Sequence, residues 1–393
     1  MKTMKWKFYS LAFVAGMSIL TAYSCDDNND NDGNGGNGNG NEIENGTILK
    51  GTITSDVTLA AGNTYKLSGE YIVEEGATLH IEEGVKIIAV YDDIADYILV
   101  KQGGKINAVG TPDKPIVMTS EKEEPGAWGG IHICGRAHTN AEGGKGSSEI
   151  GGAVYGGNDD ADNSGTLQYI RLEYTGFAFD EEHEANGISF YGVGNGTIVD
   201  HCQAYKGSDD GFEFFGGSVN VSNLVAVSCS DDSFDWTEGW NGKGTNLVAY
   251  QEAESTLGYD CDCLMECDNN GSNNAATPVA HPVLKNLILV GNGGSKQGIR
   301  LRAGTEVEID NAKVCGKGQP LTVETALTEN ALKNGTSKLT NITLTSELSC
   351  KEGIYTHADF IAVTSNKVNA NLSYSSFEDI KKECSWMNGS WVK

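Results

Sequence analysis

Acidic residues recur at a fixed spacing in the middle of the chain. Six of them occupy two sets of positions that are 22 residues apart: Asp209, Asp210 and Glu213, then Asp231, Asp232 and Asp235. Clusters of carboxylate oxygens from loops are what Ca²⁺ binds in proteins. The spacing therefore indicates a candidate calcium site, and we predict Asp209, Asp210, Asp231, Asp232 and Asp235 as its ligands.

Three other interpretations of these acids stay open. Like charges directly across from one another are unfavourable, so the carboxylates need some form of relief. Protonation of some of them would provide it, as would capping of turns, in which an Asp accepts backbone N–H groups. A catalytic role is the remaining interpretation, with Glu213 and Asp235 as candidate residues.

The residues around the acids indicate the elements that hold them. Phe212 and Phe214 flank Glu213, as Phe234 and Trp236 flank Asp235. Successive side chains in a β-strand point to opposite faces, so we expect the aromatic rings inside and the acids outside. A repeat this short is typical of a solenoid, whose repeats pack only against their neighbours.

Short runs rich in Val, Ile, Thr, Phe and Tyr, separated by Gly, Asn and Asp, dominate the whole chain and favour β-structure. We predict an all-β fold, a right-handed parallel β-helix with long loop excursions and a C-terminal cap. The excursions are expected at residues 141–165, 177–186 and 252–282. The chain is expected to be a monomer.

The N-terminus has the pattern of an exported protein. Lysines precede an apolar run at residues 11–20, which predicts a signal peptide over residues 1–24. Small residues before Cys25 are similar to a bacterial lipobox and predict lipidation of this Cys; ordinary cleavage that leaves a free Cys25 is the alternative. Acidic, Gly- and Asn-rich residues then predict a flexible tether over 25–42, followed by one domain over 43–393.

Several segments resemble a known family of surface proteins. They are residues 103–120, 125–137, 164–176, 208–217 and 230–240, in this order. Together they resemble right-handed parallel β-helix surface lipoproteins of the Bacteroidetes, within the pectin-lyase-like superfamily. The resemblance implies an envelope location. The acidic residues directly after Cys25 resemble the surface-export signal of Bacteroidetes lipoproteins, which implies an outer-membrane protein, anchored only through its lipid and facing the cell exterior. The family resemblance implies no reaction, because the activity of that family is not settled.

A catalytic column is the second hypothesis for function. The register places Ser189, Glu213, Asp235 and Arg300 on one outer face, with Asp260 or Asp262 between the last two. Polysaccharide lyases built on β-helices hold an acidic sugar through carboxylate-bound Ca²⁺ and take a proton with Arg or Lys. The expected alternative for Arg300 is an ion pair with an acid on a neighbouring coil.

Aromatic residues and cysteines add two further expectations. Trp128, Tyr155 and Trp240 lie at or near excursions, where exposed rings can stack on sugars; covering the solenoid wall is the alternative for each. Cys261, Cys263 and Cys267 are expected to hold the third excursion in place through disulfides, which an oxidising compartment allows; a metal site with His281 as fourth ligand is the alternative. Disulfide bonding is likewise expected in the C-terminal cap, which contains Cys350 and Cys384.

The net charge limits the partners. The chain carries 28 basic and 54 acidic residues, a formal net charge of −26. Such a surface repels nucleic acid over long range. We therefore expect no nucleic-acid partner and favour non-catalytic, Ca²⁺-assisted binding or adhesion to carbohydrate through Arg300 and the aromatic residues. A lyase or glycoside hydrolase acting on polysaccharide, and a structural surface-layer role, are the alternatives.

Overall fold

The computed structural model describes residues 41–92, 94–179 and 183–393. The predicted signal peptide, Cys25 and most of the tether lie outside the described residues. The described residues, from Asn41 to Lys393, form one compact unit. Its first strand, β1 (Asn41–Ile43), pairs with a later strand, so the domain begins two residues before the predicted boundary at 43. None of the described helices is long and apolar enough to cross a membrane.

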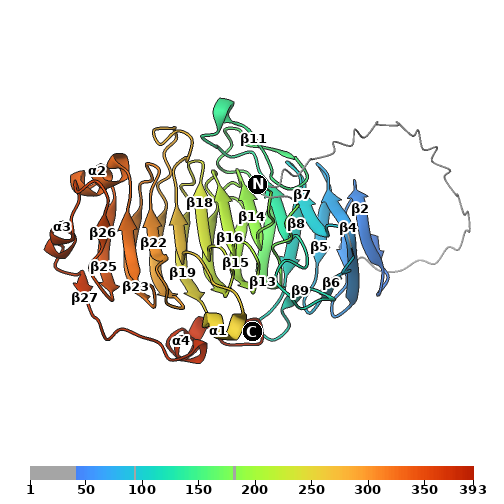
Figure 1. Cartoon of the computed structure of the whole chain (residues 1–393). Helices are drawn as coiled ribbons and strands as arrows, with labels where there is room; N and C mark the ends of the chain where they lie inside the picture. Colours follow the sequence, from blue (N-terminus) through green and yellow to red (C-terminus); the bar gives the residue numbers. More distant parts are fainter. Residues whose placement is uncertain (1–40, 93, 180–182) are drawn as a thin grey trace, which may run out of the picture. The chain divides into compact units, whose positions relative to one another are not determined.

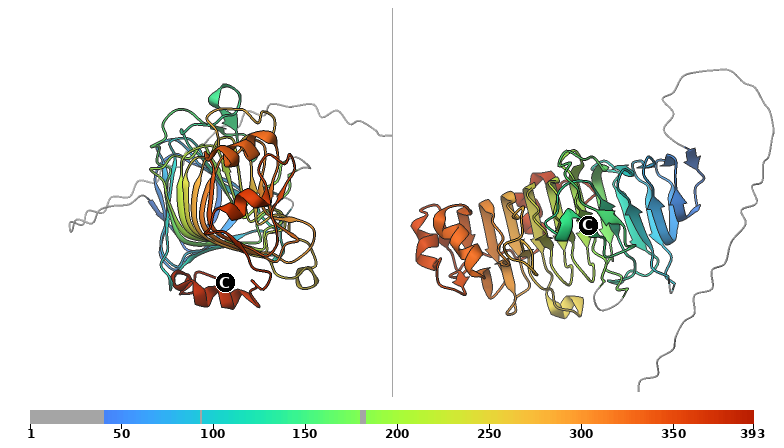
Figure 2. Two further views of the ribbon diagram at one scale, coloured as in Figure 1. Left: turned by 90° about the vertical axis from the view of Figure 1, so that its left-hand side faces the viewer. Right: turned by 90° about the horizontal axis from the view of Figure 1, so that it is seen from above.

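The domain is a right-handed parallel β-helix, as predicted (Figure 1). Each coil contributes strand segments to three walls, and every wall is a stack of parallel strands. We call them walls 1, 2 and 3. Along the chain a coil passes through wall 2, then wall 3, then wall 1. The view along the axis in Figure 2 shows the walls surrounding a common interior.

Wall 1 consists of the end of β2 (Ile48–Ile53), the end of β4 (Thr64–Val73), β7 (Tyr97–Val100), β10 (Ile131–Cys134), β14 (Ile188–Tyr191), β16 (Phe212–Phe215), β18 (Phe234–Thr237), β20 (Met265–Cys267), β22 (Gln297–Leu301), β24 (Gln319–Val323) and β26 (Ser349–Cys350). Wall 2 begins with β1, β3 (Val57–Leu59), β5 (Thr78–Ile81) and β8 (Lys105–Val109), and wall 3 with the starts of β2 and β4, then β6 (Lys86–Ala89) and β9 (Ile116–Ser120). From there on, walls 2 and 3 share long strands: β13 (Gly165–Glu173), β15 (Ile198–Tyr205), β17 (Asn220–Val227), β19 (Lys243–Tyr250), β21 (Val283–Val290), β23 (Glu308–Cys315) and β25 (Lys338–Leu344).

Each shared strand bends at one residue with a left-handed backbone. In five successive coils this residue is Asn: Asn223, Asn246, Asn286, Asn311 and Asn341, with φ between 55° and 63°. Asn tolerates this conformation better than most residues because its short polar side chain bonds locally. The first four amides also bond to one another along the stack, at 2.8 to 3.0 Å. We call this row the asparagine ladder.

The interior is filled by the inward side chains of the strands, as the alternation predicted. Phe212 and Phe214 are 0% and 2% exposed, while Glu213 between them faces outward. The ring of Phe212 stacks on that of Phe234 at 5.6 Å between centroids. Stacked rings in successive coils therefore fix the register that aligns the acids on the outside.

The loop excursions differ in one respect from the prediction. The first contains the 3₁₀ helix η1 (Glu142–Gly144) and a small antiparallel sheet of β11 (Gly146–Ser147) and β12 (Val154–Tyr155). The predicted third excursion, 252–282, is divided by β20, a regular strand of wall 1. It is two excursions, one with α1 (Glu254–Leu257) before β20 and one after it.

The C-terminal part both caps and wraps the solenoid. Helices α2 (Ala326–Asn334) and α3 (His357–Ala362) lie at the last coils, and the final strand is β27 (Lys367–Val368) (Figure 1). Residues 369–393, which we call the strap, then return along the outside of wall 3 through α4 (Phe377–Glu383) and the 3₁₀ helix η2 (Ser385–Met387). The strap ends against early coils, where Ser390 donates its backbone N–H to the Pro112 carbonyl at 2.8 Å.

Candidate metal centre

One column of side chains in register runs along the outer face of wall 1. Its members are His132, Ser189, Glu213, Asp235, Glu266, Arg300 and Thr322. The predicted neighbours Glu213 and Asp235 are directly opposite each other, as expected. The position between Asp235 and Arg300, expected for Asp260 or Asp262, is held by Glu266 instead. The excursion before β20 lengthens that coil, so a constant repeat does not locate Glu266.

The paired acids in the turns serve partly as caps. Asp210 Oδ1 accepts the backbone N–H of Asp232 at 2.8 Å, and Asp232 Oδ1 accepts that of Cys263 at 2.6 Å. Asn186 Oδ1 starts the series by accepting the backbone N–H of Asp210 at 3.2 Å. Turn capping, one of the open interpretations, is therefore correct for one oxygen each of Asp210 and Asp232. It does not account for Asp209, Glu213, Asp231 or Asp235.

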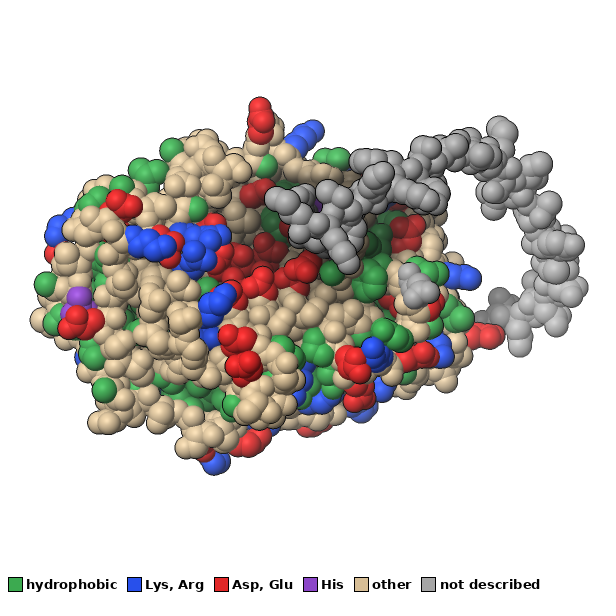
Figure 3. Space-filling model, viewed as in Figure 1, with side chains coloured by type: hydrophobic (Ala, Val, Ile, Leu, Met, Phe, Trp, Pro, Cys, Tyr) green, Lys and Arg blue, Asp and Glu red, His purple; other side chains and the backbone are tan. Residues whose placement is uncertain are grey.

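Carboxylates alone line a hollow of about 190 Å³ at this place. Its lining residues are Glu149, Glu184, Asp209, Asp210, Glu213, Asp231 and Asp235. Figure 3 shows the corresponding acidic patch near the middle of the face. Among the described residues, no Lys or Arg forms an ion pair with any of the seven. The hollow is therefore a concentration of negative charge that no direct ion pair with a Lys or Arg of the described residues neutralises.

Two of the lining residues escaped the sequence analysis because they come from loop excursions. Glu149 belongs to the first excursion and Glu184 to the second, and neither has a counterpart at the 22-residue spacing. Their approach to wall 1 depends on how the loops fold over it. The burial of Ile150 beside Glu149 holds the first of these loops down on an apolar cluster around Tyr191.

Burial and mutual repulsion change the protonation of the hollow. Burial, followed by the charges of Asp231 and Glu184, raises the pKa of Asp209 to about 7. Burial and the charge of Asp262 raise the pKa of Asp231 to about 6. The pKa values of Glu213 and Asp235 lie well above their usual range, first because of burial and then because of neighbouring acids. Without a cation, several of these groups keep their protons near neutral pH.

The oxygen atoms are close enough together for a cation. Three groups of acids each bring one oxygen per residue within 4.8 Å of the others: Asp209, Asp210 and Asp231; Asp210, Glu213 and Asp235; and Asp232, Asp235 and Glu266. Asp235 Oδ1 is buried and has no hydrogen-bond partner among the described residues. Flexible clusters of carboxylate oxygens suit Ca²⁺, so the donor set fits the predicted ion. All five predicted ligands lie in these groups.

Arg300 is held by acids on both neighbouring coils, as its ion-pair alternative predicted. Its Nη1 lies 2.8 Å from Glu266 Oε2, and its Nε lies 3.2 Å from Glu324 Oε1. Arg302 extends the network through Nε, 2.7 Å from Asp268 Oδ1. Burial lowers the pKa of Arg300, but the two ion pairs raise it more, so the net shift is upward.

Comparison with known protein families agrees with this architecture. A family model described as a pectate-lyase-like beta helix domain matches residues 51–393. The chain belongs to this family. Searches of curated proteins and of solved structures gave no match. A pectate-lyase-like β-helix is consistent with a function related to carbohydrate, without distinguishing binding from catalysis.

The aromatic residues proposed for sugar stacking are not on the surface of this pectate-lyase-like domain. Trp128, Tyr155 and Trp240 are 0%, 3% and 1% exposed. Trp240 stacks on Phe214 at 4.2 Å, and Trp128 donates its indole N–H to the Glu173 carbonyl at 2.8 Å. The expectation of exposed rings is wrong, because each ring turns back under its loop and fills the wall.

The expected disulfides are absent from the described part of the domain. Each of its cysteines is a free thiol, Cys261, Cys263 and Cys267 included. Cys267 points inward, in register with Trp236 and Leu301, and is thus part of the core. Cys350 packs against the central core while Cys384 belongs to the cluster under the strap, so the two lie in different apolar clusters.

Proposed function

We propose that this protein is a non-catalytic carbohydrate-binding protein of the cell surface, in which Ca²⁺ held by the carboxylate hollow takes part in binding. The observation that carries the proposal is the lining of the hollow, seven acids of which none forms an ion pair with a Lys or Arg of the described residues. The unpartnered Asp235 Oδ1 is a ready ligand atom within it. A divalent cation would compensate the charge and take the place of the protons.

The position of the hollow suits a ligand from outside. It opens on the outer face of wall 1, beneath the excursions that carry Glu149 and Glu184. Ca²⁺ accepts six to eight oxygen ligands, so hydroxyl or carboxylate oxygens of a sugar can complete a shell begun by the protein. Figure 3 shows basic side chains beside the acidic patch, where they suit an anionic group of the same glycan.

The state of Arg300 favours binding over lyase chemistry. A lyase needs a group that removes a proton from the sugar ring, and that group must be unprotonated when it acts. Arg300 is the candidate in this column, but the carboxylates of Glu266 and Glu324 stabilise its charged form. It is better suited to fixing the column and the outer edge of the hollow.

Anchoring at the membrane is the second part of the proposal. Cys25 would carry the lipid, and the tether would place the domain outside the outer membrane. The support is the sequence pattern of signal, Cys and acidic tether. The domain would then meet polysaccharide or cell-surface glycans as a monomer, with no contact to the bilayer other than the lipid.

Retention of polysaccharide tests the binding function. In electrophoresis through gels containing neutral or acidic polysaccharides, we expect at least one polysaccharide to slow the protein with Ca²⁺ present. Chelator or Asp235→Asn should abolish the retardation, and Asp113→Asn, the same change of charge at an exposed site, should not. An unsaturated uronide product absorbing in the ultraviolet, or new reducing ends, would contradict the non-catalytic assignment. No retardation by any polysaccharide would favour the structural surface-layer role.

A further inference from the structure

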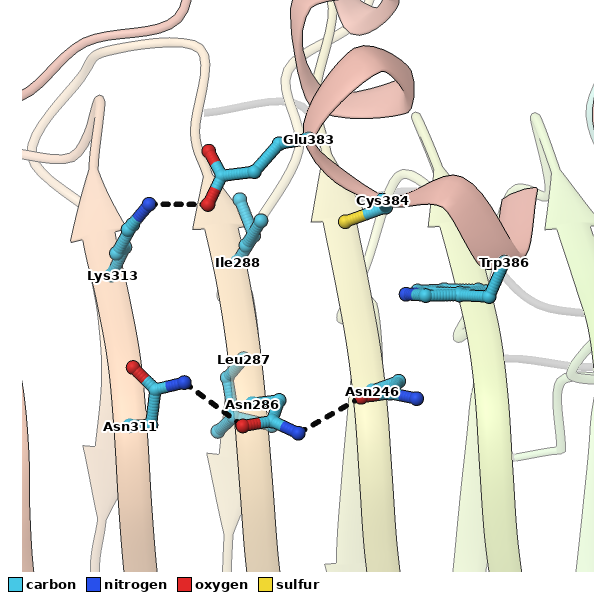
Figure 4. A pocket seen from close by; sticks show the side chains of 9 residues that line it. All are labelled: Asn246, Asn286, Leu287, Ile288, Asn311, Lys313, Glu383, Cys384 and Trp386. Carbon is cyan, nitrogen blue, oxygen red and sulfur yellow. Dashed lines mark hydrogen bonds and ion pairs between the residues drawn. The ribbon is translucent and has the colours of Figure 1, made fainter. Parts of the chain in front are cut away.

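A second pocket lies on another side of the solenoid, between the strap and the bend that joins walls 2 and 3. It measures about 320 Å³, near the lower end of the range for small-ligand sites. Asn246, Asn286 and Asn311 form one edge of it, and Glu383 and Trp386 of the strap form the opposite side (Figure 4). The pocket exists only because the strap folds back over wall 3.

The asparagine edge offers unused hydrogen-bonding groups at regular intervals. Asn286 donates one N–H to Asn246 Oδ1 at 3.0 Å, and Asn311 donates one to Asn286 Oδ1 at 2.8 Å. A side-chain amide has two N–H donors, so each of these residues retains one beyond the ladder. Asn311 Oδ1 accepts no hydrogen bond from the described residues. The pocket edge thus presents both donors and an acceptor, fixed by the stack.

The strap contributes an aromatic face and a neutralised pair of charges. Trp386 is half-buried, and Figure 4 shows its indole ring extending from η2 toward the side of Asn246. Lys313 and Glu383 form an ion pair at the other end of the pocket. Glu383 Oε2 also accepts the Tyr374 hydroxyl at 2.8 Å, which holds the carboxylate in place. No uncompensated charge is left for an ionic ligand.

We propose that this pocket binds a neutral saccharide unit. Sugar hydroxyls both donate and accept hydrogen bonds, which matches the mixture of amide donors and acceptor along the ladder. The apolar C–H face of a pyranose ring suits the flat, partly exposed indole of Trp386. Trp386 supplies an aromatic platform that the buried Trp128, Tyr155 and Trp240 do not.

This site is independent of the calcium hollow. The hollow lies on the outer face of wall 1, whereas the saccharide pocket lies at the bend between walls 2 and 3 and contains no residue of the hollow. Binding here therefore requires no Ca²⁺. Either proposal can therefore fail without affecting the other. Chelator distinguishes them, because it should abolish binding at the calcium hollow and leave binding at the saccharide pocket unchanged.

Tryptophan fluorescence tests the pocket directly. The other four tryptophans in the described residues are fully buried, so in protein without residues 1–24, which contain Trp6, quenching by acrylamide reports mainly on Trp386. The probes are maltose, cellobiose, lactose and N,N′-diacetylchitobiose, titrated in chelator. We expect at least one to protect Trp386 from quenching, with a dissociation constant in the millimolar range or below, and isothermal titration calorimetry to give the same value.

Variants distinguish a loss of saccharide binding at this pocket from a general loss of stability. Trp386→Ala should weaken binding, as measured by calorimetry, at least tenfold, and Trp386→Phe should preserve most of it. Asn286→Gly removes one ladder amide while tolerating the left-handed backbone, and we expect a similar loss. Asn341→Gly makes the same change at φ 56°, in the same row but outside the pocket, and should bind as the wild type. Absence of binding by all four probes, or binding unchanged in Trp386→Ala, would overturn the proposal.

Discussion

Asp235 combines burial with an unsatisfied carboxylate oxygen, and its neighbours in the column are the acids Glu213 and Glu266. A buried charge without a partner is costly, and the carboxyl group avoids part of the cost by keeping its proton. Bound Ca²⁺ would reverse the preference and stabilise the ionised form. Removing the charge of this residue should therefore stabilise the protein when no Ca²⁺ is bound and destabilise it when Ca²⁺ is bound.

Replacing Asp235 by Asn should stabilise the ion-free protein and weaken its response to Ca²⁺. In chelator we expect the free energy of unfolding at pH 7.5 to rise by roughly 1 kcal/mol, since an unpaired acid is removed from a repulsive cluster. With Ca²⁺ the wild type should be the more stable protein. Melting curves of both proteins, with Asp113→Asn as control, provide the comparison. A variant less stable than wild type in chelator would argue against repulsion.

The raised pKa values predict how stability depends on pH. The pKa of Asp209 rises from 3.8 to about 7 on folding, and that of Asp231 from 3.8 to about 6. Between pH 4 and 7 the native state thus binds more protons than the unfolded state, and stability falls as pH rises. In chelator we expect the free energy of unfolding to fall by roughly 2 kcal/mol between pH 5 and pH 7.5, mainly through the buried Asp209, because solvent screens the exposed Asp231. Denaturant unfolding at both pH values measures this change in the free energy of unfolding. In Asp209→Asn the difference between the two pH values should be smaller.

At this scale the sequence predicted the outward acids well and the aromatic surface badly. A strand alternates with period two, so Phe212, Glu213 and Phe214 could be assigned to faces without a structure. Glu266 was missed because an excursion of variable length precedes its strand. Trp128 and Trp240 were misplaced because proximity to a loop in sequence does not tell whether the ring turns outward or back into the wall.

At the scale of elements, the strap covers the apolar outer side of wall 3. Outward side chains such as Val225, Val248 and Ile288 are apolar and are covered by Ile380, Met387 and Trp391 of the strap. Arg171 also binds the strap, with its Nη1 2.8 Å from the Ser390 carbonyl oxygen. The strap is thus a structural part of the domain rather than a loose tail.

Deletion of residues 369–393 should destabilise the protein without removing the hollow. The strap contributes three side chains that are 0% exposed: Ile380, Met387 and Trp391. Burial of such a side chain stabilises a protein by ~1.5–3 kcal/mol, so the deletion should lower the free energy of unfolding by roughly 5 kcal/mol. Denaturant unfolding should show this loss, and 1-anilinonaphthalene-8-sulfonate should bind the exposed wall. Ca²⁺ binding should persist, because the strap contributes no residue to the hollow. Unchanged stability would show that the strap is dispensable.

The prediction of these elements from sequence had a physical limit. A solenoid repeats its core, so the 22-residue spacing predicted the coils and the alignment of Glu213 with Asp235. The strap has no repeat and its helices are short, so the sequence predicted only a cap at this end. The missing disulfides have a related cause, because nothing in the spacing of Cys261, Cys263 and Cys267 tells that Cys267 faces the core.

At the scale of the whole molecule, the anchor would determine where the domain acts. The net charge of −26, counted over the whole chain, keeps the protein away from polyanions unless cations intervene. A lipid at Cys25 and a polar tether would place that charge outside the bilayer. The family assignment rests on residues 51–393 and is independent of this anchor.

Replacing Cys25 by Ser should release the protein from the membrane. We expect labelled palmitate to be incorporated into the wild type and not into the variant, and the variant to appear in the soluble fraction. Protease added to intact cells should degrade the wild-type domain if it faces the exterior. Equal labelling of both proteins would show that the lipid is attached elsewhere or not at all, and protection from protease would place the domain in the periplasm.

Direct measurement of Ca²⁺ binding tests the central claim most closely. Isothermal titration calorimetry of the metal-free protein at pH 7.5 should show saturable binding, with a dissociation constant of ~1 mM or tighter, as for extracellular calcium sites. Asp235→Asn and Asp209→Asn should each weaken it at least tenfold, whereas Asp113→Asn should leave it unchanged. No saturable binding by the wild type, or equal binding by all variants, would contradict the assignment of the hollow as a calcium site.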